Sequence, residues 1–158
     1  MEPGNEAGGA PAATVQHAEP DAKPNFGLAI VAGIAVAVLG AVLWAFVTVV
    51  SGYELGLMAI AIGFLVGQAI RFAGKGTDKR FGYLGAVCAL AGCLLGNYLS
   101  AIAFFAKAQG LDLMQVIGIL DPDLSQKLMT ATFSAMDLLF YAIAIYEGFK
   151  FSTEQRAQ

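Results

Sequence analysis

The sequence predicts an all-α integral membrane protein built as a bundle of four transmembrane helices, and three observations lead to this prediction. The segment from Phe26 to Tyr53 contains no Asp, Glu, Lys or Arg, and it exceeds the ~20 apolar residues that a helix needs to cross a bilayer core. The composition is 58% hydrophobic and 13% charged, against about 25% charged in soluble domains. Further apolar runs follow along the 158-residue chain, so we expect a single membrane domain.

The membrane domain is expected over residues 26–150, and its apolar runs differ in quality. The third run has no charged residue inside it, whereas the fourth is less apolar because it carries Asp137 and Glu147. The four spans are predicted at about 26–50, 55–73, 81–105 and 130–149.

Polar tails are predicted at both ends of the chain. Residues 1–25 combine four prolines with Gly, Ala and acidic residues and have almost no large apolar side chains. Such a segment buries too little surface to offset its ordering entropy, so we expect a disordered tail. Residues 151–158 form a short C-terminal tail.

The connection over 106–129 precedes the last helix and is predicted to lie at the membrane interface on the outer, non-cytoplasmic side. Its apolar stretch, 111–120, is too short to span a bilayer, so it lies on the lipid surface or packs on the bundle. Asp121 followed by Pro122 is typical of a helix start, with an acidic cap and proline in the first turn. We therefore expect the last helix to begin near Pro122 and to enter the bilayer later.

The basic residues predict the orientation. With the N-terminus in the cytoplasm, only Lys107 and Lys127 of the nine Lys and Arg residues lie on the opposite side. This asymmetry agrees with the positive-inside rule and predicts that both termini are cytoplasmic.

Small residues recur at helical spacing in the predicted spans and indicate where helices approach closely. In a membrane, helix association depends on packing rather than on a hydrophobic driving force, so small residues mark contact faces. The steps of three or four residues keep each set on one side of its helix. We predict packing contacts at Gly63, Gly67, Gly85, Ala89, Gly92 and Gly96.

One stretch resembles a known group of proteins. The chain has GYELGLMAI at 52–60, GFLVG at 63–67 and AIR at 69–71. This pattern is similar to that joining the first two spans of uncharacterised four-span bacterial inner-membrane proteins. The resemblance implies the same topology and a location in the bacterial inner membrane, and it brings no activity with it.

Asp137 is the most unusual residue of the predicted spans, because a charged carboxylate near a helix centre costs about 2.5–3.5 kcal/mol by insertion scales. Asn97 and Ser100 are expected at a similar depth. In a structural interpretation Asp137 is protonated or hydrogen-bonded to Asn97, Ser100 or a tyrosine. In a functional interpretation it binds a proton or a cation. Gln68 is a further polar residue of the predicted spans.

Two groups of charges are expected at the cytoplasmic ends of the spans. Arg71 and Glu147 are predicted at comparable depth, where they either form an ion pair or extend separately toward the headgroups. Lys75, Lys79 and Arg80 form a basic loop that either contacts anionic lipid headgroups or simply reflects the topology.

The sequence favours a function without catalysis. The only histidine, His17, lies in the predicted tail, and no nucleophile–base pair or metal-ligand set is apparent. We expect no cofactor, and the net charge of −3 does not suggest nucleic-acid binding. The leading hypothesis is a structural or accessory subunit that packs on other membrane proteins, or on itself, through its Gly/Ala faces. The alternative is an oligomeric transporter or channel that uses Asp137, Asn97 and Gln68.

Overall fold

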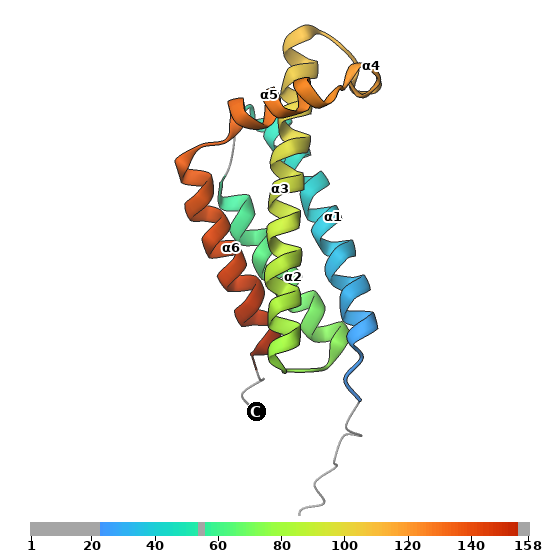
Figure 1. Cartoon of the computed structure of the whole chain (residues 1–158), viewed down its shortest axis with the longest axis vertical. Helices are drawn as coiled ribbons and strands as arrows, with labels where there is room; N and C mark the ends of the chain where they lie inside the picture. Colours follow the sequence, from blue (N-terminus) through green and yellow to red (C-terminus); the bar gives the residue numbers. More distant parts are fainter. Residues whose placement is uncertain (1–22, 54–55, 155–158) are drawn as a thin grey trace, which may run out of the picture.

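The described part of the chain is all-helical. The computed structural model describes residues 23–53 and 56–154, and these contain six helices and no strand (Figure 1). The all-α prediction is therefore confirmed. Most of the tail predicted over 1–25, and residues 155–158 of the C-terminal tail, lie outside the described residues. The helices are α1 (Phe26–Ser51), α2 (Leu57–Gly74), α3 (Lys79–Gln109), α4 (Leu113–Ile119), α5 (Pro122–Thr132) and α6 (Ala135–Thr153).

Three helices are long and apolar enough to cross a membrane, namely α1, α2 and α3. A fourth span is present if α5 and α6, which meet at a bend of 89°, are counted as one broken span. Helix α6 does not count as a membrane span by itself, because three charged residues, Asp137, Glu147 and Lys150, lie within its 19 residues. The chain thus has the helices of a membrane protein.

The four longest helices, α1, α2, α3 and α6, lie side by side (Figure 1). Helices α2 and α3 contact each other and both of the remaining two, whereas the described residues of α1 and α6 do not contact each other. Both ends of the described chain lie at one end of this assembly (Figure 1), which we call the proximal end. The opposite end, where α4 and α5 lie, is the distal end.

Small residues set the distances between these helices. A Cβ on Gly63 would collide with the backbone of Ala144, and one on Gly85 would collide with the carbonyl of Gly148. The predicted packing residues lie at contacts inside the chain and are all buried: Gly63, Gly67, Gly85 and Ala89 face α6, Gly92 faces α1 and α2, and Gly96 faces α1. These faces are occupied within the chain rather than left free for a partner.

The distal end carries the two short helices. Val116 of α4 is buried against Ile102 and Ala106, which belong to the last turns of α3. Helix α5 starts as the sequence indicates, because the Asp121 carboxylate accepts a hydrogen bond from the Leu124 N–H (2.6 Å).

The last helix is interrupted, whereas a continuous helix was predicted. The chain leaves the helix at Phe133, whose backbone is extended, and a new helix begins at Ala135 rather than near Pro122 or residue 130. The physical cause is local, because Ser134 caps the new helix and sets a different direction for it. Helix α6 then continues to Thr153, so the first residues of the predicted C-terminal tail are helical.

Candidate functional site

Polar side chains meet in the core near the distal end. The buried Asn97 of α3 donates a hydrogen bond from Nδ2 to the hydroxyl of the buried Tyr141 of α6 (3.0 Å). The buried Ser100 donates to the carbonyl of Gly96 on its own helix (2.8 Å). The Asn97–Tyr141 bond links α3 to α6, and in a membrane such bonds contribute about 0.6 kcal/mol on average.

Asp137 lies in the first turn of α6 and caps it. Its Oδ2 accepts a hydrogen bond from the Ser134 N–H (2.7 Å), and the Ser134 side chain accepts in return from the backbone of Asp137. This reciprocal arrangement satisfies two backbone donors that a helix start leaves unpaired. The carboxylate therefore has a local structural role in the first turn of α6.

The structure brings three of the predicted polar residues around one small cavity. Asp137, Asn97 and Ser100 line it together with Trp44 and Gly56, and its volume is about 10 Å³. This is about the space that one water molecule occupies. Gln68 does not line the cavity, because it lies on α2 closer to the proximal end.

The expected ion pair between Arg71 and Glu147 is not formed. Within the described chain, Glu147 Oε2 is buried and has no hydrogen-bond partner. The reason is the register of two parallel helices: Gly63 faces Ala144 and Gly67 faces Gly148. The same register makes Arg71 level with residue 152, more than one turn beyond Glu147.

The effects on stability of replacing Arg71 and Glu147 are therefore expected to add. In a double-mutant cycle of Arg71→Ala and Glu147→Ala, the two changes in unfolding free energy should sum to within about 0.5 kcal/mol, as they do for groups that share no interaction. Reversible unfolding in detergent measures all four proteins. A coupling energy clearly above this value would show that Arg71 and Glu147 do interact.

A basic pocket of about 260 Å³ lies at the proximal end. It is lined by Arg71, Lys75 and Thr77, and Glu154 supplies a carboxylate to the same pocket. Lys79 and Arg80 are exposed, but they do not line it. The lipid-headgroup role expected for Lys75, Lys79 and Arg80 stays a prediction.

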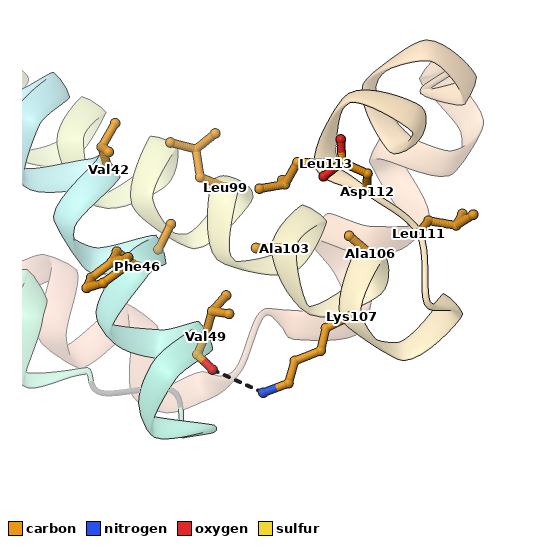
Figure 2. Close-up of a pocket in the computed structure, with 11 residues that line it drawn as sticks. Val42, Phe46, Val49, Leu99, Ala103, Ala106, Lys107, Leu111, Asp112 and Leu113 are labelled. Carbon is orange, nitrogen blue, oxygen red and sulfur yellow. Dashed lines mark hydrogen bonds between the residues drawn. The ribbon is translucent and has the colours of Figure 1, made fainter.

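A further pocket lies at the distal end between α1 and α3, and the sequence did not predict it. Its volume is about 500 Å³, and we call it the α1–α3 pocket (Figure 2). The turn between α3 and α4 covers its distal side. Its lining is apolar except for Lys107 and Asp112 and comprises Val42, Ala45, Phe46, Val49, Leu99, Ala103, Ala106, Lys107, Leu111, Asp112 and Leu113.

The surroundings of the two cysteines indicate a structural role. Cys88 and Cys93 are free and buried, and Cys93 Sγ lies 3.9 Å from the carbonyl of Ala59 on α2. Across the described ranges, no group of three or more His, Cys, Asp or Glu side chains is placed to hold a metal ion.

No protein-family model, curated protein or solved structure matches this chain.

Proposed function

We propose that this chain is a multi-pass protein of the bacterial inner membrane, a bundle of four transmembrane helices with both termini in the cytoplasm. The proximal end, which carries Lys23, Arg71, Lys75, Lys79, Arg80 and Lys150, is then cytoplasmic. The distal end, with Lys107 and Lys127, faces the other side, and α4 and α5 lie at that interface. The charge asymmetry supports this orientation.

Within that membrane we propose a non-enzymatic role as a structural or accessory subunit of a membrane complex or a homo-oligomer. The observation that supports it is the peripheral position of α1. Only 22% of its most apolar stretch is buried, against 56% for α3, and α1 contacts only α2 and α3 among the described helices. Apart from the pocket residues Val42 and Phe46, its outward side carries the large apolar residues Val31, Ile34, Val38, Leu39, Leu43 and Val50.

The partner contact is then expected on the outer side of α1 rather than on the Gly/Ala faces. The small residues already pack against neighbouring helices of the same chain. A partner subunit, or a second copy, would therefore meet bulky side chains on α1, which would otherwise face lipid.

Photocrosslinking in the native membrane tests this role. A photoreactive amino acid at Leu39 on α1 is expected to give adducts with a second polypeptide, whereas one at Leu139 on α6 gives lipid adducts only. Both positions are more than half exposed and apolar, so Leu139 is a matched control. Lipid adducts alone from both positions, together with a monodisperse particle of one 16.4 kDa chain in mild detergent, would refute the subunit proposal.

A second candidate function, an oligomeric transporter or channel, is supported by the cavity that Asp137, Asn97 and Ser100 share. The fully buried Thr48 does not line this cavity, but its hydroxyl oxygen has no hydrogen-bond partner in the described chain. If this candidate holds, liposomes with the wild-type protein conduct protons or cations and Asp137→Asn abolishes the flux. The substituted asparagine would still accept a hydrogen bond at the start of the helix, so an unchanged flux, or none in the wild type, would reject it.

A further inference from the structure

The α1–α3 pocket opens on the side of the protein that faces lipid. Val42 and Phe46, two residues of its α1 wall, are 54% and 65% exposed. The α3 wall includes Leu99 and the small Ala103 and Ala106, whose short side chains leave the space unfilled. An apolar chain in the surrounding bilayer therefore reaches the pocket without crossing a polar surface.

Two opposite charges stand at the distal side of this pocket. Lys107 donates one hydrogen bond from Nζ to the carbonyl of Val49 near the end of α1 (3.2 Å), and an ammonium group has two further N–H donors. Asp112 caps α4 and is exposed. In the described chain these two residues form no ion pair, and Figure 2 shows them pointing to different sides of the pocket.

We propose that the α1–α3 pocket binds one phospholipid of the phosphatidylethanolamine class. An acyl chain lies between α1 and α3, the phosphate accepts hydrogen bonds from Lys107, and the primary amine donates to Asp112. A volume of about 500 Å³ falls within the range of ~300–1,000 Å³ that is usual for ligand pockets. The headgroup carries one positive and one negative charge, and the pocket lining has one charged residue of each sign.

Related lipids separate the parts of this proposal. Phosphatidylcholine has the same phosphate but no N–H on its nitrogen, so it cannot donate to Asp112. Phosphatidylglycerol has a net negative charge and no amine, so it would be the preferred lipid if Lys107 alone attracted the headgroup.

Two substitutions remove one charge each with little other change. Asp112→Asn keeps a good helix cap for α4 because asparagine caps as well as aspartate. Lys107→Gln removes the ammonium group and keeps a polar side chain of similar reach. Lys127→Gln is the matched control, because Lys127 lies on α5 and does not line the pocket.

The experiment is native mass spectrometry of the full-length protein, purified in mild detergent and titrated separately with phosphatidylethanolamine, phosphatidylcholine and phosphatidylglycerol. We expect the wild type and Lys127→Gln to bind phosphatidylethanolamine about tenfold more tightly than phosphatidylcholine, which is the usual effect of one charge-assisted hydrogen bond. Asp112→Asn should abolish this preference and leave phosphatidylcholine binding unchanged. Lys107→Gln should weaken the binding of both lipids about tenfold.

Several results would overturn the proposal. One is an Asp112→Asn protein that still prefers phosphatidylethanolamine as the wild type does. Another is a Lys107→Gln protein that binds both lipids as tightly as the wild type. Tighter binding of phosphatidylglycerol by the wild type would leave Asp112 without a role. A co-purified polypeptide that both pocket variants release would assign the pocket to a protein partner instead.

Discussion

Replacing Gly85 with alanine is expected to lower the free energy of unfolding by about 1–3 kcal/mol, the usual cost of overpacking a core. The added Cβ would meet the carbonyl of Gly148 and the hydroxyl of Ser152. A backbone atom cannot rotate away as a side chain can, so α3 and α6 must separate. Helix propensity alone would favour alanine over glycine by ~1 kcal/mol. A net destabilisation would therefore show that the steric clash outweighs this gain.

The matched control is Gly118→Ala on α4. It makes the same chemical change in a helix, but no atom lies within 4 Å of the added Cβ. Gly118→Ala should leave stability unchanged or raise it slightly through helix propensity. Reversible unfolding in detergent measures both variants, and a Gly85→Ala protein as stable as the Gly118→Ala protein would refute the close contact of α3 with α6.

Removing the ring of Phe81 is expected to cost about 3 kcal/mol, as is typical for Phe→Ala at a buried site. Phe81 is only 3% exposed, and its ring meets that of Phe26 edge to face, with centroids 5.4 Å apart. Gly74 and Gly76 lie so close to the ring that neither could carry a Cβ. The side chain thus holds the start of α1 and the connection between α2 and α3 together.

Phe81→Ala should also increase trypsin cleavage at Lys75 and Lys79, because the connection loses its anchor. Phe46→Ala is the control, since Phe46 is 65% exposed on α1 and its removal leaves no cavity in the core. Equal stability and equal cleavage of the two variants would show that the Phe81 ring does not anchor this connection.

Some features could be predicted because they depend on neighbouring residues alone. The Asp121–Pro122 helix start is one example, since the cap and the proline act within a single turn. The capping role of Asp137 has a similar local signal, because Ser134 and Asp137 have the spacing of a capping box. The prediction missed it by treating residues 130–149 as one continuous apolar span.

Other features could not be predicted, because they depend on how far one helix is shifted along another. The separation of Arg71 from Glu147 follows from the register of α2 against α6, and no local pattern encodes that shift. The inward use of Gly63 and Gly85 is similar: spacing identifies a smooth face, but it does not say whether the chain itself covers that face.

The sequence alone determined that this chain forms long apolar helices, because a segment in lipid must satisfy every backbone hydrogen bond within itself. Only the tertiary structure decided which surfaces stay open. The glycine faces close against neighbouring helices, the described residues leave the outer side of α1 uncovered, and Lys107 and Asp112 come to line one pocket. The physical reason is that helix formation depends on contacts within a few residues, whereas these surfaces depend on side-chain packing between distant segments.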